Sequence, residues 1–122
     1  MPLLISTPTR IPIPGGKVID EHVGAVNTPT TGLDTSVSVA HMVAPPGWSE
    51  PFQTPEFGEI TLVVKGTVVV EHDGGRLEVH AGQSVITTGG ERIRYSCGAD
   101  GAEYVAVCLP AFSPDTVHRD AE

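Results

Sequence analysis

The chain has 122 residues, enough for one domain with a single packed core. Fifteen acidic residues against seven basic ones give a net charge of −8, so the chain lacks the positive field that nucleic acid or an anionic membrane surface would need. No apolar run approaches the roughly 18 residues of a membrane span, and prolines interrupt the N-terminus where a signal peptide is apolar, so we expect a cytoplasmic protein.

Residues 1–34 are predicted to form an extended arm. Prolines recur through this segment and exclude interior helices. Four β-branched residues can still form short edge strands between the turns: Ile11, Ile13, Val18 and Ile19. The sequence leaves two positions open for the arm, across a neighbouring subunit or folded back on its own barrel.

From residue 35 onward the pattern is typical of β-strands. Residues 35–43 alternate strictly, with Val37, Val39, His41 and Val43 on one face and Ser36, Ser38, Ala40 and Met42 on the other. Further strands are expected at 58–66, 67–72, 76–80, 83–88, 92–97 and 103–109. Asp73-Gly74-Gly75 is a hairpin signal, and a second hairpin is expected around residues 98–101. Short strands separated by glycine turns indicate an antiparallel sandwich or barrel, followed by a polar tail with room for one helical turn.

Two cysteines, Cys97 and Cys108, are present. In the expected hairpin they lie several ladder positions apart, too far for a disulfide. We therefore predict two reduced thiols, as in a cytoplasmic protein. A catalytic Cys108 stays open, although no His or Asp stands at a spacing that nominates it.

The segment Pro46–Gly66 carries a spaced motif. Gly47 is followed after five residues by two positions, Gln53 and Pro55, then by Glu59, and after six more residues by Gly66. A second spaced stretch runs from Gly82 to Cys97, with Thr88, Gly90, Ile93 and Cys97 at its fixed positions.

These two motifs in register resemble those of the cupins, and the chain resembles a small single-domain cupin over roughly residues 35–110. The resemblance implies an all-β fold, a cupin-type antiparallel β-barrel or double-stranded β-helix jelly roll of the RmlC-like type. One domain would then span 1–122, with an arm at 1–34, a barrel core at 35–110 and a tail at 111–122. Small cupins usually pair through a sheet face and an N-terminal arm, so a homodimer is expected.

The metal-binding histidines of the family are replaced here. Gln53, Pro55 and Ile93 stand in three of the four ligand positions, and only Glu59 is a good ligand. We expect no cofactor. A divalent metal is the alternative, held by Glu59, Gln53 and His41.

The resemblance implies that Glu59 points into an apolar cavity. Loss of hydration there raises the pKa of its carboxyl, which suits the group to acid–base catalysis. Tyr95 shares the inward face of Ile93 and can donate a hydrogen bond to an oxyanion. The expected substrate-binding residues are Gln53, Glu56, Trp48, His41 and Phe52, with Glu56 as a second carboxylate and the aromatic residues as a rim. The competing interpretation pairs Glu59 with Arg92 or Arg94 as a structural ion pair and makes Trp48 ordinary packing.

Three functions follow from this equipment. The first is a metal-independent or weakly metal-dependent enzyme of the isomerase, cyclase or lyase type, acting on a small organic molecule. The second is a non-catalytic module that binds a small ligand. The third is a divalent-metal oxygenase with atypical ligands, which the missing histidines disfavour. Neither nucleic acid nor a membrane is expected as a partner, and the sequence leaves open whether the protein is an enzyme.

Overall fold

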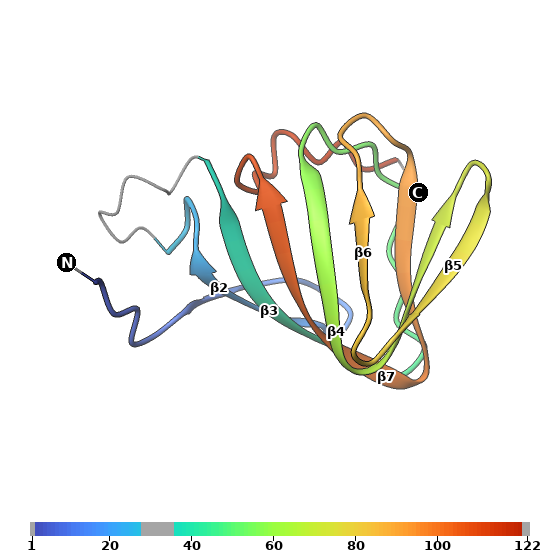
Figure 1. Ribbon diagram of the computed structural model, residues 1–122, viewed down its shortest axis with the longest axis horizontal. Helices are drawn as coiled ribbons and strands as arrows, with labels where there is room; N and C mark the ends of the chain where they lie inside the picture. Colours follow the sequence, from blue (N-terminus) through green and yellow to red (C-terminus); the bar gives the residue numbers. More distant parts are fainter. Residues whose placement is uncertain (1, 28–35, 121–122) are drawn as a thin grey trace.

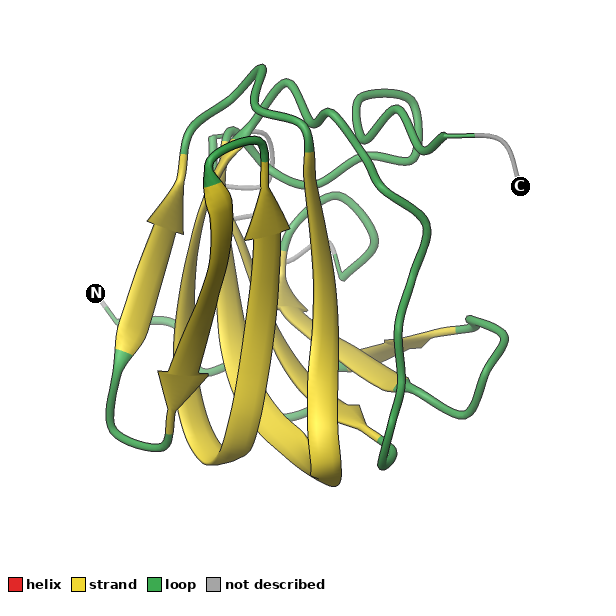
Figure 2. Cartoon of the chain, turned by 90° about the vertical axis from the view of Figure 1, so that its right-hand side faces the viewer, coloured by secondary structure: helices red, strands yellow, loops and turns green. Residues whose placement is uncertain are grey.

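Seven β-strands make up the described part of the computed structural model, which covers residues 2–27 and 36–120. They are β1 (Thr9–Ile11), β2 (Val18–Val23), β3 (Ser38–Ala44), β4 (Gly58–His72), β5 (Gly75–His80), β6 (Ser84–Thr87) and β7 (Ile93–Leu109). Within these ranges no helix is long and apolar enough to cross a membrane. The strands curl into an antiparallel barrel with loops at both ends (Figures 1 and 2), so the all-β jelly-roll expectation is confirmed.

The barrel is built on one long antiparallel ribbon of β4 and β7. The two strands pair from Gly58 opposite Leu109 at one end to His72 opposite Ile93 at the other. Gly66 lies where the pairing shifts register, at a φ of 75°. A Cβ at Gly66 would lie 2.1 Å from the carbonyl oxygen of Gly101, so only glycine lets the two strands approach here.

The ribbon corrects two sequence predictions. Residues 58–66 and 67–72, expected as separate strands, form the single strand β4. The hairpin expected around 98–101 is wrong, because β7 continues through Gly101 and bends there. The reason is that glycine supports a bend within a strand as readily as a reversal. The hairpin at Asp73-Gly74 is confirmed, with His72 opposite Gly75.

The remaining strands add to the two ends of this ribbon. The order is β1-β2-β3-β7-β4-β5, and β6 pairs with the first half of β4. The N-terminal segment folds back on its own barrel, because β2 pairs with β3 and β1 with β2 (Figure 1). The part of the expected arm at 28–34, and residue 35 of the following strand, lie outside the described residues.

The packed core fills one half of the barrel. Its centre is made by inward side chains of β4, β5 and β7, among them Val68, Val70, Val79 and Ile93. In the other half the inward positions of β3 and β7 hold small residues such as Ser38, Ala40 and Ala106. Small side chains cannot fill the space between the strands, so this half keeps a cavity.

The two cysteines are buried and free. Cys97 lies opposite Val68 and Cys108 opposite Glu59, at distant positions along the β4–β7 ribbon. The prediction of no disulfide is therefore confirmed, although the ribbon rather than a hairpin separates the two thiols.

The C-terminal tail, residues 110–120, closes over the cavity half without forming a helix in its described part. Phe112 packs edge-on against Phe57, with ring centroids 5.7 Å apart. Arg119 forms a β-bridge with Gln53. The tail thus brings an aromatic ring and a guanidinium to the site.

Candidate functional site

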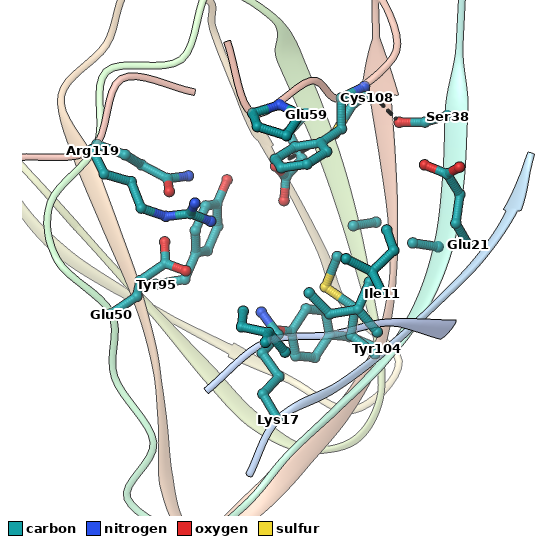
Figure 3. A pocket seen from close by; sticks show the side chains of 18 of the residues that line it. Ile11, Lys17, Glu21, Ser38, Glu50, Glu59, Tyr95, Tyr104, Cys108 and Arg119 are labelled. Atoms are coloured by element: carbon teal, nitrogen blue, oxygen red, sulfur yellow. Dashed lines mark hydrogen bonds between the residues drawn. The ribbon is translucent and has the colours of Figure 1, made fainter. Parts of the chain in front are cut away.

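A cavity of about 270 Å³ occupies the open half of the barrel. Its apolar wall comes from the N-terminal segment, β3, the segment just before β4 and the tail. It includes Ile11, Ile13, Met42, Phe57 and Phe112. Five charged side chains also line it: Lys17, Glu21, Glu50, Glu59 and Arg119 (Figure 3). An apolar pocket with a few convergent polar groups is the usual form of a small-molecule site.

Glu59 lies on β4 with its carboxylate directed into the cavity (Figure 3). Thr61 donates a hydrogen bond to its Oε2 at 3.1 Å, and the Cys108 thiol lies 3.6 Å from its Oε1. Burial raises the pKa of the Glu59 carboxyl, and the Thr61 hydrogen bond and the Lys17 charge oppose the rise only in part. Burial therefore favours the protonated form of this carboxyl, which is the form that can act as a general acid.

Glu50 is a second cavity carboxylate, and it was not among the predicted residues. Burial raises its pKa to about 7, against the opposing charges of Lys17 and Arg119. Its Oε2 is buried and has no hydrogen-bond partner among the described residues. The charge of Glu59 raises the pKa of Glu50, and the charges of both carboxylates raise the pKa of Tyr95. Two carboxylates in one cavity then favour a state in which only one is charged.

Lys17 supplies a buried ammonium group to the same cavity. Its side chain is 8% exposed, and Nζ lies 4.0 Å from the centroid of the Trp48 ring and 5.2 Å from that of Tyr104. Burial lowers the pKa of Lys17, while the charges of Glu50 and Glu59 act in the opposite direction. Within the described residues Lys17 forms no ion pair and its ammonium no hydrogen bond, so cation–π contacts are its direct stabilisation.

Tyr95 projects inward from β7 and is 5% exposed. Its hydroxyl lies 3.0 Å from Thr87 Oγ1. Burial raises the pKa of Tyr95 above its ordinary value, so the phenol stays protonated and can donate a hydrogen bond. Cys108 behaves in the same way, because burial raises the pKa of its thiol. A protonated thiol is a poor nucleophile, which argues against a catalytic Cys108.

Gln53 lies at the cavity with a side chain that is 4% exposed. Its backbone pairs with that of Ile93, with hydrogen bonds of 2.8 Å in both directions. The two spaced sequence motifs therefore meet at this point. The side-chain Oε1 of Gln53 is buried without a partner among the described residues, so an acceptor faces a site where a ligand can supply a donor.

Four predicted substrate-binding residues do not line the cavity. Glu56 is exposed and bonds to His118 Nε2, because the irregular segment turns it outward. His41 lies on the outer face of β3, where its Nε2 is 2.8 Å from Glu103 Oε2. The alternation of β3 explains this, since Ala40 and Met42 take the inward positions.

The two predicted rim aromatics also lie elsewhere. Phe52 packs under the guanidinium groups of Arg92 and Arg94, at 4.1 and 4.7 Å from the ring centroid. Trp48 belongs to the packed core and borders a separate shallow hollow beside the cavity. In the structure Trp48 thus makes packing contacts, and its ring also supports Lys17.

The structural ion pair proposed for Glu59 is absent from the described structure. Arg92 pairs with Asp120 at 2.7 Å, and Arg94 pairs with Glu71 at 2.8 Å. The two arginines flank the buried Ile93 and point outward, so neither reaches the cavity face of β4. The Glu59 carboxylate therefore forms no ion pair with either of them.

Sequence reasoning missed four charged residues of the cavity: Lys17, Glu21, Glu50 and Arg119. Lys17 comes from the N-terminal segment, Glu50 from the loop inside the first motif and Arg119 from the tail, so no strand pattern contains these three. Glu21 lies on β2, outside the strand residues that the sequence indicated. One signal was available for Lys17, which stands as a single charge between apolar residues of a segment expected to be extended.

A metal ion does not fit the residues that the structure gathers here. Among the described residues no three His, Cys, Asp or Glu side chains come together as a ligand set. The predicted third ligand, His41, lies on the outer face of the sheet. In its place the cavity contains Lys17, whose ammonium cannot coordinate a cation and repels one.

Comparisons with known proteins agree with the fold. The sequence model of the cupin domain matches residues 40–109. A protein of Myxococcus xanthus (strain DK1622) named endoribonuclease YbeY is 43% identical over 111 residues, which cover 90% of this chain and 36% of that protein. The chain therefore spans about a third of the length of this relative.

Several solved structures have a similar shape. Oxalate decarboxylase from Bacillus subtilis superposes with a TM-score of 0.75 at 17% identity, covering 94% of this chain and 30% of that chain. A variant of Streptomyces PAC13 with uridine gives a TM-score of 0.73 at 17% identity, covering 97% of this chain and 88% of that one. A putative ethanolamine utilization protein Q from Salmonella typhimurium gives 0.60 at 21% identity, covering 79% and 71%. At these identities the likeness concerns the fold.

Proposed function

Because the chain belongs to the cupin domain family, we propose that it acts on a small organic molecule by proton transfer at the cavity carboxylates, with no metal ion required. The observation that carries the proposal is the pair Glu50 and Glu59, two desolvated carboxyl groups with raised pKa values in one enclosed site. Such a pair can supply one ionised base and one protonated acid at the same pH.

The proposed chemistry uses three side chains. The ionised carboxylate takes a proton from a carbon or hydroxyl of the substrate, and the protonated carboxyl returns one to another of its atoms, so no net proton is consumed. Of the two carboxyl groups, we assign the main part of this proton transfer to Glu59. Tyr95 donates a hydrogen bond to the oxygen on which negative charge develops, since its phenol stays protonated. Two carboxyl groups and a phenol can catalyse isomerisation, cyclisation or β-elimination.

The proteins of similar fold support a small molecule as the ligand. The names of the solved structures connect one of them with oxalate and another with uridine. Both are small molecules, and the cavity volume of about 270 Å³ also limits the ligand to a small size. The acidic chain and the two buried free thiols fit a cytoplasmic location, which we propose without assigning a nucleic acid or membrane partner.

The test is deuterium exchange in deuterated water containing a metal chelator. Small aldehydes, ketones and 2-oxo acids are incubated with the protein, and loss of the proton next to the carbonyl is followed by NMR. We expect Glu59→Gln to lower the exchange rate on the order of a hundredfold or more, while the exposed Glu78→Gln leaves it unchanged. Equal rates for the wild type and Glu59→Gln, or exchange that starts only after a divalent metal is added, would contradict the proposal.

Metal analysis of the purified protein gives an independent check. We expect less than stoichiometric iron, manganese and zinc, because the cavity presents Lys17 where a ligand set is needed. A stoichiometric metal would overturn the metal-independent part of the proposal.

A non-catalytic binding module is the second candidate. It is favoured by the unpaired acceptors Gln53 Oε1 and Glu50 Oε2, which a bound ligand can satisfy without any reaction. Saturable binding of a small molecule with no proton exchange in any of the compounds would select this function.

We also propose a homodimer that pairs through the outer face of the sheet. A row of aliphatic side chains crosses four strands there, from Val39 through Val107 and Ile60 to Ile86. Ile86 is 74% exposed, and a continuous apolar sheet face of this kind favours a covering partner. Light scattering at micromolar concentration should give a dimer for the wild type and a monomer for Ile86→Asp. A monomeric wild type would exclude the dimer.

A further inference from the structure

Lys17 differs from ordinary lysines of a small protein in its burial and in its lack of an anionic contact. The side chain is 8% exposed and lines the cavity. An ammonium group has three donors and is costly to take out of water unless they are satisfied. Within the described residues none of these donors has an acceptor, so the cavity holds a cation with free hydrogen-bonding capacity.

Two acceptors with the complementary deficiency line the same cavity. Gln53 Oε1 and Glu50 Oε2 are buried, and the described residues offer neither a donor. A buried acceptor without a partner destabilises the folded state. Free donors and free acceptors in one cavity indicate a ligand that carries both an acceptor and a donor.

The remaining wall and the volume limit what this ligand can be. Ile11, Ile13, Met42 and Phe57 give the cavity an apolar side. A volume of about 270 Å³ is small for a ligand pocket. The ligand is therefore a small molecule that combines its polar groups with an apolar part.

We propose that Lys17 is the anion-binding residue of this cavity and that the ligand class is a small hydroxy-substituted carboxylic acid. Its carboxylate accepts hydrogen bonds from Lys17 Nζ, its hydroxyl donates to Gln53 Oε1 or Glu50 Oε2, and its carbon chain contacts the apolar wall. Figure 3 shows Lys17 and Glu50 at the cavity. This inference rests on the proposed function, because it names the ligand of the same site. Trp48 and Tyr104 position the ammonium through their ring faces.

The first arm of the test measures recognition of the charge. Lactate, 3-hydroxybutyrate and mandelate are each titrated against the protein by NMR together with their primary amides. We expect the wild type to bind at least one acid more tightly than its amide by on the order of tenfold. Lys17→Met should abolish this preference, and Lys65→Met, which changes the exposed second lysine, should retain it.

The second arm measures recognition of the hydroxyl. The same acids are compared with propionate, butyrate and phenylacetate, which lack it. The wild type should prefer the hydroxy acid, and Gln53→Met should reduce that preference while leaving the preference for acid over amide intact. Lys17→Met should do the reverse, so the two variants separate the two ends of the ligand. Circular dichroism checks that both variants are folded. The wild-type preferences for acid over amide and for hydroxy acid over plain acid are measured without any variant.

Three outcomes would overturn the inference. They are a wild type that binds no acid more tightly than its amide, a folded Lys17→Met that keeps the preference, and a Lys65→Met that loses it. The result is separable from that of the proposed function, because binding needs no turnover. Glu59→Gln should keep the preference for the acid even though it stops proton exchange, and exchange lost without a change in binding leaves the ligand class standing.

Discussion

The two halves of the barrel are built by the same pair of strands but have opposite interiors. In one half β4 and β7 point Val68, Val70 and Ile93 into a packed core. In the other half the same strands point Glu59, Ala106 and Cys108 into a cavity. Strand alternation decides which residues face inward in both halves. Side-chain size and the segments that cover the opening decide whether the interior is filled.

The two halves also differ in where their charged side chains lie and whether these form ion pairs. In the described structure, Arg94 and Glu71 near the packed half form an ion pair on the outer face. In the cavity half Lys17, Glu50 and Glu59 remain inside without direct ion pairs. Burying charge in this way costs stability. We therefore attribute the cavity half to function and the packed half to folding, and the following predictions test that division.

The largest effect is expected at the junction of the halves, Gly66. Gly66→Ala places a Cβ 2.1 Å from the Gly101 carbonyl oxygen, a backbone atom that cannot move aside locally, at a φ of 75°. We expect a loss of roughly 4 kcal/mol or more in unfolding free energy, in the range that single substitutions rarely reach. Urea unfolding measures it.

Gly82→Ala is the matched control for this junction. Gly82 has a φ of 86°, and an added Cβ would meet no atom within 4 Å. Only the left-handed backbone then opposes the side chain, at a cost of roughly 1–2 kcal/mol. Equal losses for the two variants would show that the contact between the halves at Gly101 is not what requires Gly66.

A smaller effect is expected from the charge in the cavity half. Burial raises the pKa of Glu50 from its ordinary value of 4.5 to about 7, so the folded state binds this proton more tightly than the unfolded state. The contribution is fully present below pH 4.5 and is lost as pH rises through about 7. The shift corresponds to at most about 3 kcal/mol, and we expect about 2 kcal/mol because the cavity admits solvent.

Glu50→Gln should remove this loss. Unfolding free energies of the wild type, Glu50→Gln and Glu78→Gln are compared by urea unfolding from acidic to mildly alkaline pH. The advantage of the wild type over Glu50→Gln should shrink as the pH rises, while Glu78→Gln runs parallel to the wild type. Part of the fall should persist in Glu50→Gln, since burial raises the pKa of Glu59 in the same direction. Parallel curves for the wild type and Glu50→Gln would contradict a buried, titrating Glu50.

The sequence predicted the fold and the inward strand positions better than the cavity. Glu59 and Tyr95 were placed inside because each sits on a strand whose register the two motifs define. His41 was misplaced because alternation gives two faces without saying which is inside, and β3 turns Ala40 inward instead. The pattern also could not show that a glycine bends β7 at Gly101 rather than ending it.

Three of the missed residues share a physical reason. Lys17, Glu50 and Arg119 lie in loops or in the tail, where neither periodicity nor spacing fixes the direction of a side chain. Their meeting depends on long-range packing of the N-terminal segment and the tail against the barrel, which one sequence does not encode in any local pattern. The same packing explains why Phe52 was predicted at the rim but lies under two arginines.

The smallest predicted effect compares two buried alanines, one in each half. Ala44 is 3% exposed within the packed core, and Ala106 is 1% exposed at the cavity wall. Enlarging Ala44 to Val should cost about 1 kcal/mol or somewhat more, because a filled core must distort to admit two more carbons. Ala106→Val directs the same carbons toward open space and should cost less than about 1 kcal/mol.

Urea unfolding gives the stabilities, and titration with the hydroxy acids should show weaker binding for Ala106→Val alone, since it alone reduces the volume of the cavity. If Ala106→Val costs as much stability as Ala44→Val, the space beside Ala106 is not available to a side chain, and the division of the barrel into a packed half and an open half would have to be redrawn.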